Sequence, residues 1–255
     1  MPLFGAVVGL YAIIGLICFF GGLLSGATGF GALIVMIPLL LFFLDMPTAI
    51  PLGVLCSVGM QFQGALIFHA HIQTRRLIPL AIGSLPGVWL GGMFLRGLPE
   101  LWLKTGLGIL FLCYSFWSLA GRESGPARPP AAAWGYAVGF CSGALGGAFG
   151  IIGPPAIIYA ARTGWAPEAI RGTLNALFTI LFVCIAFAHF MQGLLVAEVW
   201  RLAAFCVPVC FVGNRIGMRL SSRLNPERYL RILFLLITAM GVSLCLPGLR
   251  ALLGW

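Results

Sequence analysis

Charged residues are scarce in this 255-residue chain: they make up 8% of it, whereas a soluble domain carries roughly 25%. Hydrophobic residues reach 61%, and the mean hydropathy is +1.07. No water-soluble fold of this length could hide so much apolar surface, so the solvent must be a lipid bilayer. The apolar runs are continuous over roughly 20 residues, as in membrane helices, and do not alternate as barrel strands do. We therefore expect an all-α integral membrane protein.

Acidic residues are especially rare, with six against fifteen basic residues and a net charge of +9. All six fall in loops or near segment ends: Asp45, Glu100, Glu123, Glu168, Glu198 and Glu227. The chain therefore lacks the mid-membrane carboxylate that often couples transport to protons or sodium. The basic residues sit in short loops between apolar runs, as in cytoplasmic membrane loops, so we expect no nucleic-acid partner.

The sequence also lacks the usual marks of a catalytic or metal site. Its eight cysteines fall almost entirely in apolar runs, where cysteine acts as a small hydrophobe. Cys206 and Cys210 lie one helical turn apart, but no nearby cysteine or histidine in the sequence completes a metal set. His69 and His71 have no carboxylate or thiolate close by. We expect no disulfide, no metal, no cofactor and no catalytic residue, and hence no enzyme.

Ten apolar segments divide the chain, and one polar stretch rich in proline and glycine interrupts them. The expected segments are 5–24, 31–44, 49–68, 77–95, 101–120, 132–145, 151–161, 168–190, 196–217 and 228–248. The stretch 121–131 is expected to be a cytoplasmic linker between a first domain, 1–120, and a second, 132–255. No lysine or arginine precedes Arg75, so the first segment lacks the basic start of a signal peptide and is expected to be retained.

The two domains resemble each other in the order and spacing of their motifs. SGATGFG at 25–31 is matched by SGALGGAFG at 142–150, and His69 is matched by His189. Because each domain holds five segments, an odd number, the second domain enters the membrane from the opposite side. The sequence therefore predicts two inverted five-helix repeats, the architecture of many secondary transporters.

Lysine and arginine divide unequally between the two sides of this topology. Four lie on one side: Arg96, Lys104, Arg201 and Arg250. Eleven lie on the other: Arg75, Arg76, Arg122, Arg128, Arg162, Arg171, Arg215, Arg219, Arg223, Arg228 and Arg231. Cytoplasmic loops carry the excess of basic residues, so we expect the second group in the cytoplasm and both termini on the outer side.

The segments 31–44 and 151–161 are too short to cross a bilayer comfortably, since a span needs about 20 residues. We expect each to form a hairpin with the segment before it, the two tips meeting near the middle of the membrane. Free N–H groups at the helix start after each tip would suit an anion. The expected lining residues are Ser25, Thr28, Gly29, Phe30, Gly31, Gly146, Gly147, Gly150 and Gly153. Close helix packing is the alternative, and we assign it to Gly83, Gly87, Gly91, Gly213 and Gly217.

Polar residues inside apolar segments are further candidates for a substrate pathway. Ser57, Gln61 and Gln63 lie in the third segment, and Asn175 lies in the eighth. Hydrogen bonding between helices is the alternative role for these residues. Arg171 and Arg215 would attract an anion if they face a cavity, and would otherwise extend to the membrane surface.

His69 and His189 lie near segment ends at matching positions of the two domains. Histidine changes its charge near neutral pH, so gating or proton transfer is one interpretation of the pair. Anchoring at the membrane interface is the other interpretation.

SGATGFG at 25–31 is followed by Pro38, and the second domain carries GFCSG at 139–143 and GGAFGIIGPP at 146–155. With these motifs the chain resembles, over essentially its whole length, the TauE/SafE family of sulfite and organosulfonate exporters. The resemblance implies a multi-pass transporter of the bacterial inner membrane. It also implies a small sulfur-containing or carboxylate anion as the substrate.

An inside-negative potential drives anions outward by ~2.3 kcal/mol per charge per 100 mV. Export therefore needs no coupling ion, whereas import would, and the chain shows no mid-membrane acid to bind one. We favour an exporter that works by alternating access of the two repeats. A proton-coupled anion importer and a non-transporting membrane scaffold are the alternatives. The expected partners are a small anion and lipid, and a homodimer is left open.

Overall fold

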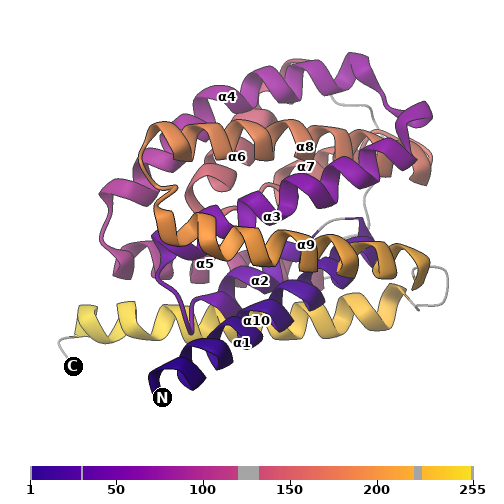
Figure 1. Ribbon diagram of the computed structural model, residues 1–255. Coiled ribbons are helices and arrows are strands. Elements are labelled where there is room, and N and C mark those ends of the chain that lie inside the picture. Colours follow the sequence, from indigo (N-terminus) through magenta and orange to yellow (C-terminus); the bar gives the residue numbers. More distant parts are fainter. Residues whose placement is uncertain (1, 30, 120–131, 221–225, 254–255) are drawn as a thin grey trace.

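The computed structural model describes residues 2–29, 31–119, 132–220 and 226–253, and helices with short connections make up these residues (Figure 1). Ten α-helices and one short 3₁₀ helix, η1, follow one another: α1 Pro2–Thr28, α2 Ala32–Leu40, α3 Met46–Ile67, η1 His69–His71, α4 Thr74–Gly97, α5 Glu100–Leu119, α6 Ala132–Phe149, α7 Gly153–Ala161, α8 Pro167–Met191, α9 Ala197–Leu220 and α10 Pro226–Leu253. The expected all-α membrane fold with ten helices is confirmed. The linker expected at 121–131 and the candidate site residue Phe30 lie outside the described residues.

Five of the described helical stretches are long and apolar enough to cross a bilayer. They are Gly9–Thr28, Met46–Ile67, Thr74–Gly97, Pro167–Met191 and Ala197–Leu220. Hydrocarbon offers no partner to a backbone N–H or C=O group, so segments of this kind cross as helices, which pair these groups internally. Large apolar side chains such as Phe62, Trp89 and Phe187 are exposed on the outside of these helices, where lipid would cover them.

The helices break at the two glycine-rich motifs, a few residues later than hydropathy indicates. α1 continues to Thr28 and α6 to Phe149, because their small residues stay helical while packed against neighbouring helices. The backbone then turns at Gly29 and Gly31, with φ of 85° and 94°, and at Gly150, with φ of 73°. Glycine adopts these angles without steric cost. The helices that follow, α2 and α7, have nine residues each and rise only about 13.5 Å, less than half of the ~30 Å hydrocarbon core.

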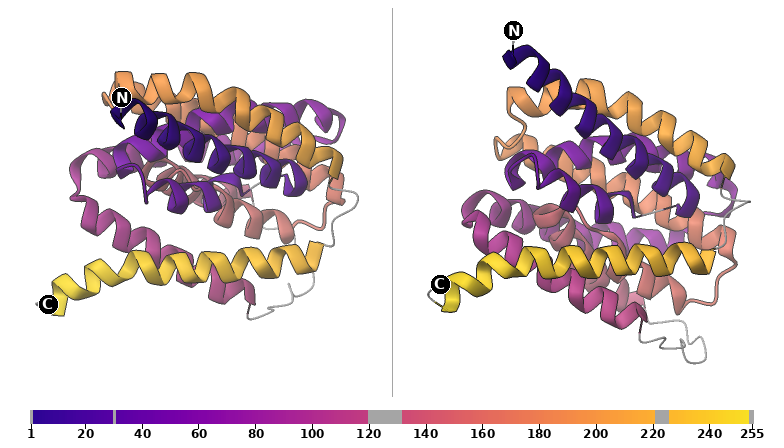
Figure 2. Two further views of the ribbon diagram at one scale, coloured as in Figure 1. Left: turned by 60° about the horizontal axis from the view of Figure 1, so that its bottom comes forward. Right: turned by 90° about the horizontal axis from the view of Figure 1, so that it is seen from below.

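The helices pack mainly in pairs that join the part of the chain before the linker to the part after it (Figure 2). These pairs are α1 with α9, α3 with α8, α4 with α6, and α5 with α10. α3 also packs against α9, and α8 also packs against α4. The α3–α8 pair is therefore central. The α1–α9 pair packs on its α3 side, and the α4–α6 pair packs on its α8 side. The short helices α2 and α7 pack against α3 and α8.

Glycines allow two of these pairs to approach to backbone contact. A Cβ atom added at Gly83, Gly87 or Gly91 of α4 would collide with the backbone of α6. One added at Gly213 or Gly217 of α9 would collide with the backbone of α1. The expected packing role of these five glycines is confirmed, and it fixes α4 on α6 and α9 on α1 as closely joined units.

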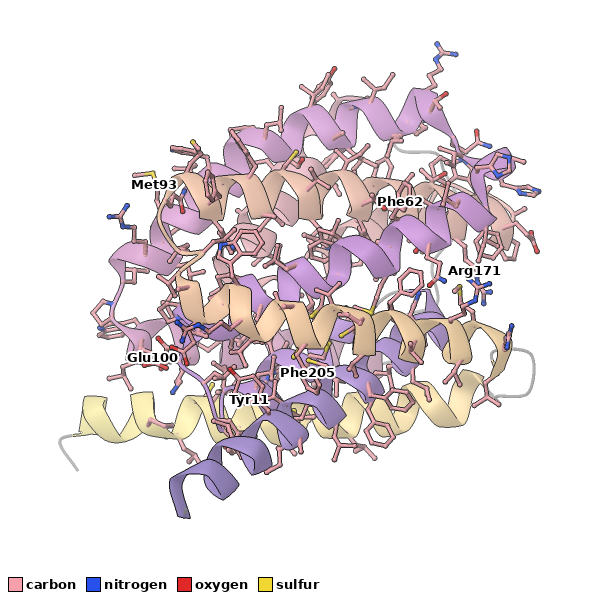
Figure 3. The ribbon with its side chains drawn as sticks, viewed as in Figure 1. Tyr11, Phe62, Met93, Glu100, Arg171 and Phe205 are labelled. Atoms are coloured by element: carbon pink, nitrogen blue, oxygen red, sulfur yellow. The ribbon has the colours of Figure 1, made fainter. Side chains whose placement is uncertain are left out.

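The bundle has two distinct ends (Figures 1 and 2). At one end α4 joins α5 and α8 joins α9, and both termini lie toward this end. At the opposite end η1 joins α3 to α4, and α7 joins α8. Figure 3 marks the first end by Glu100 and the second by Arg171, and we call them the Glu100 end and the Arg171 end.

Candidate functional site

A cavity of about 490 Å³ lies at the Arg171 end, between α1, α3, α8 and α9. The C-terminal parts of α1, α3 and α9 meet the N-terminal turn of α8 there. Arg171, Arg215 and Arg219 line the cavity and are exposed, whereas Ser25 and Asn214 line it and are buried. The cavity therefore extends from the surface into the bundle. We call it the arginine cavity.

The arginine cavity is strongly positive. Arg171, Arg215 and Arg219 each bring a guanidinium cation to its lining. None of the described residues that line the cavity is acidic. The guanidinium group presents planar pairs of N–H donors that match the oxygens of an oxyanion. The charge and the donor geometry of the cavity both favour an anionic ligand.

Side-chain amides complete the polar wall of the arginine cavity. Asn214 Nδ2 donates to Gln63 Oε1 at 2.8 Å and also lies 3.3 Å from the carbonyl oxygen of Met60. Gln63 Nε2 is buried and has no protein partner. Asn175 Nδ2 donates to the carbonyl oxygen of Arg171 at 2.8 Å, which leaves its Oδ1 toward Gly64. An unpaired buried donor is costly, so Gln63 Nε2 is a natural donor to a bound ligand.

The remaining wall of the arginine cavity is apolar. Met60, Leu66, Ile67, Phe68 and Met218 line it, beside the amides of α3 and the arginines of α9. A ligand with an oxyanion head and a short organic stem would place the head near the guanidinium groups and the stem against these side chains. The combination of a few polar groups with an apolar lining is typical of small-molecule sites.

A second, much smaller cavity of about 20 Å³ joins the two glycine-rich breaks. Residues 31–34 of the first break and 150–153 of the second line it together, with Ser57 and Gln61 of α3 and Phe178 of α8. Ser57 Oγ and Gln61 Oε1 are buried and have no protein partner. The space is enough for about one water molecule. We call it the break cavity, and it brings together two motifs that are far apart in the chain.

The two helix starts at the break cavity are not equivalent. α2 opens after Gly31 with ordinary residues, whose first N–H groups have no partner within the helix. α7 opens with Gly153, Pro154 and Pro155, and proline has no N–H group to offer. The expectation of free N–H groups at both tips therefore holds for α2 and needs correction for α7, where two of the first three donors are absent.

Two hydrogen bonds join the C-terminus of α8 to the α4–α6 pair at the Glu100 end of the bundle. His189 is fully buried, and its Nε2 donates to the carbonyl oxygen of Gly147 on α6 at 2.9 Å. Gln192 Nε2 donates to the carbonyl oxygen of Trp89 on α4 at 3.2 Å. His69 of η1, by contrast, is exposed, and its Nδ1 lies 2.8 Å from the carbonyl oxygen of Leu66 near the end of α3. The two matching histidines thus occupy different environments.

Comparison with known proteins decides the family. The family model described as "Sulfite exporter TauE/SafE" matches residues 14–244. This chain belongs to the TauE/SafE family. A relative from Cupriavidus necator, the "Probable sulfite/organosulfonate exporter TauE", is 32% identical over 184 residues, which cover 71% of this chain and 72% of the relative. No solved structure matches the chain. The TauE/SafE chain is therefore a multi-pass membrane protein of a transporter family, and the resemblance seen in its sequence is confirmed.

The predicted site residues of this TauE/SafE protein separate between the two cavities. The arginine cavity is lined by Ser25, Gly29, Arg171, Asn175 and Arg215. The break cavity is lined by Gly31, Ser57, Gln61, Gly150 and Gly153. The structure thus brings the two breaks together, as expected, and adds a larger charged cavity beside the first of them. That these residues bind a substrate stays a prediction.

The other predicted residues of the TauE/SafE chain contact neighbouring helices. Thr28 Oγ1 donates to the carbonyl oxygen of Leu24 at 2.9 Å. Gly147 packs on the backbone of α4, and Gly146 faces the side chains of Ile152 and Ile185. His69 lies in η1 at the Arg171 end of the bundle, and His189 lies near the C-terminus of α8 at the Glu100 end.

Sequence reasoning missed two polar cavity residues, Asn214 and Arg219, which flank the predicted Arg215 on the same helix. Arg219 is one helical turn beyond Arg215, so the spacing itself indicates that both lie on one face. Asn214 carries no such signal, because its partner Gln63 lies on another helix. Gln63 was a candidate as a polar residue of the third segment, and it lines the cavity.

The fold brings together cysteines of the TauE/SafE chain that are far apart in the sequence. The sequence shows Cys206 and Cys210 one helical turn apart and no third thiol nearby. In the fold, Cys18 of α1 and Cys56 of α3 lie beside Cys210 of α9. The absence of a metal stays a prediction.

Proposed function

We propose that this protein exports small anions with a sulfonate, sulfite or carboxylate group across the bacterial inner membrane by alternating access. The observation that carries this proposal is the arginine cavity, which has three arginines, a wall of amides and no acidic residue among its described lining. Membership of the TauE/SafE family supports the transport function. The name of the Cupriavidus necator relative supports sulfur oxyanions as the substrate class.

The arginine cavity faces the cytoplasm in this proposal. Arg75 and Arg76 open α4 at the same end of the bundle as the cavity arginines. The Glu100 end carries Arg96, Lys104 and Arg201 on the described helices. Cytoplasmic surfaces hold the excess of basic residues, which supports an inward-open cavity and termini on the outer side. An anion would enter from the cytoplasm and leave with the membrane potential, by ~2.3 kcal/mol per charge per 100 mV.

The pairing of the helices supports two inverted repeats. Let each helix of the first half, α1 to α5, be exchanged for its counterpart in the second half, α6 to α10, in order. The α1–α9 pair then becomes the α6–α4 pair, and the α4–α8 pair becomes the α9–α3 pair. All four of these pairs are present in the structure. The same exchange leaves α3–α8 and α5–α10 unchanged. An inverted repeat of this kind has two alternative states, one open to each side.

The two ends of α8 support the alternating mechanism. The Arg171 end holds the open cavity, whereas His189 and Gln192 bind α8 to α6 and α4 at the Glu100 end. In the outward-open state we expect these two hydrogen bonds to break, and His69 to close the cytoplasmic end in their place. The break cavity, too small here for an oxyanion, would widen between the two states.

Flux through sealed vesicles tests the proposed function. Purified protein in proteoliposomes should release loaded sulfite or methanesulfonate, faster when the receiving side is positive. The double variant Arg215→Ala with Arg219→Ala should lose this flux. Arg201→Ala is the matched control, because Arg201 is an exposed arginine of the same helix at the other end. Flux that ignores the imposed potential, or that follows only a proton gradient, would refute electrogenic export.

A further inference from the structure

Three cysteine thiols meet in the interior, away from the residues that line either cavity. The sulfur atoms of Cys18 on α1, Cys56 on α3 and Cys210 on α9 all lie within 4.8 Å of one another. All three residues are buried, with exposed fractions of 0%, 1% and 0%. Cys210 Sγ also donates to the carbonyl oxygen of Cys18 at 3.2 Å. We call these three residues the thiol cluster.

The composition of the thiol cluster selects a soft metal ion. The group contains sulfur alone, with no histidine nitrogen or carboxylate oxygen among its members. Hard ions such as magnesium and calcium require oxygen ligands. Thiolates select Cu(I), zinc and iron–sulfur clusters, and structural zinc takes four ligands rather than three. Cys206 lies beside Cys18 but outside the group whose sulfurs are all mutually close, so the three grouped thiols fit Cu(I) best.

The spacing of the three sulfurs fits a three-coordinate ion. Metal–sulfur bonds of about 2.3 Å directed to three corners of a plane hold the sulfurs about 4.0 Å apart. The sulfurs here all fall within 4.8 Å of one another, so rotation of the side chains is enough to close the triangle. We propose that Cys18, Cys56 and Cys210 bind one Cu(I) ion, and that this ion joins α1, α3 and α9 in the core.

The position of the thiol cluster gives the ion a route from the arginine cavity. Met60 follows Cys56 by one helical turn and lines the arginine cavity, so a thioether lies between the cavity and the cluster. Binding would replace three S–H protons by one Cu(I), which leaves two net negative charges and releases three protons to water through the cavity.

A titration of Cu(I) tests the thiol cluster without any measurement of transport. Purified wild-type protein under reducing, oxygen-free conditions should withhold one equivalent of Cu(I) from the chromophoric chelator bicinchoninic acid. Cys56→Ser and Cys210→Ser should each weaken this binding at least tenfold, with unchanged helical circular dichroism. The control combines Cys113→Ala, Cys141→Ala, Cys184→Ala and Cys245→Ala, which lie outside the cluster, and should bind Cu(I) like the wild type.

X-ray absorption of the Cu(I)-loaded wild type keeps the test decisive if the serine variants fail to fold. We expect a shell of three sulfurs and no nitrogen or oxygen. Complete transfer of Cu(I) to the chelator would show that the cluster only packs the core. Loss of binding in the four-alanine control, or a shell that contains nitrogen or oxygen, would place the ion elsewhere and overturn the proposal.

Discussion

Asn214 of α9 donates a hydrogen bond of 2.8 Å to Oε1 of Gln63 on α3, in the wall of the arginine cavity. Both side chains are buried, and the two residues lie 151 positions apart in the chain. The bond joins the α1–α9 pair to the central α3–α8 pair at the place where the cavity separates them. It therefore helps to set how far apart the two walls stand.

Removing this hydrogen bond should reveal a coupling between α3 and α9. We expect Asn214→Ala and Gln63→Ala to interact by ~0.6 to ~1.7 kcal/mol in a double-mutant cycle, the range found for hydrogen bonds between membrane helices. The free energy of unfolding in mixed detergent micelles is the measurement. Gln63→Ala combined with Gln192→Ala is the control, since these residues contact different helices and their effects should add within about 0.5 kcal/mol. A coupling as small as that of the control would contradict the structure.

Replacing an arginine of the cavity should weaken the protein's affinity for anions more than replacing an arginine outside the cavity. We expect Arg215→Ala and Arg219→Ala each to weaken methanesulfonate binding about tenfold, or about 1.4 kcal/mol. Lysine at either position should recover only part of the loss, because it keeps the charge but not the planar pair of donors. Isothermal titration calorimetry gives the affinities. Arg75→Ala, which removes an exposed charge at the same end but outside the cavity, should have a smaller effect, and an equal effect would indicate a diffuse surface charge instead of a site.

The parts of this structure that hydropathy determines were predictable, and the contacts between helices were not. Apolar runs of spanning length indicated the long helices, and the glycines at 29, 31 and 150 indicated the breaks, because positive φ has a clear residue preference. The helix ends were less certain: α1 runs on to Thr28 since Gly22 and Gly26 pack on α9. Local composition does not report such tertiary packing.

The candidate site was predictable where it depends on a motif and hidden where it depends on packing. Arg171, Asn175 and Arg215 stood out because polar residues in apolar segments are unusual. The hydrogen bond between Asn214 and Gln63 was not predictable, because it joins two helices that are far apart in the chain. The thiol cluster was hidden for the same reason, since Cys18, Cys56 and Cys210 come from three helices.

Gly31 should tolerate alanine only at a cost in backbone energy. A Cβ atom there meets no atom within 4 Å, but φ is 94°, a region that L-residues rarely adopt. We expect Gly31→Ala to lower the free energy of unfolding by about 1–2 kcal/mol while the protein still inserts. Gly97→Ala is the matched control, because its Cβ also meets no atom within 4 Å and its φ is ordinary, so it should be neutral or slightly stabilising. Equal effects of the two substitutions would rule out backbone conformation as the reason for glycine at 31.

The hydrogen bonds of His189 and Gln192 should hold the Glu100 end closed. Each bond between membrane helices contributes about 0.6 kcal/mol, so losing both should raise the open population roughly sevenfold. Ile185 reports this opening, because it is fully buried one turn before His189 and faces Gly146.

In an otherwise cysteine-free protein, a water-soluble methanethiosulfonate should therefore label Ile185→Cys about sevenfold faster when His189→Ala and Gln192→Ala are added. His71→Ala, which changes an exposed histidine in η1 at the other end, is the control and should leave the labelling rate unchanged. If the double variant is labelled no faster than the control, these two bonds do not close the Glu100 end. The closure would then rest on the packing of α8 against α4 and α6.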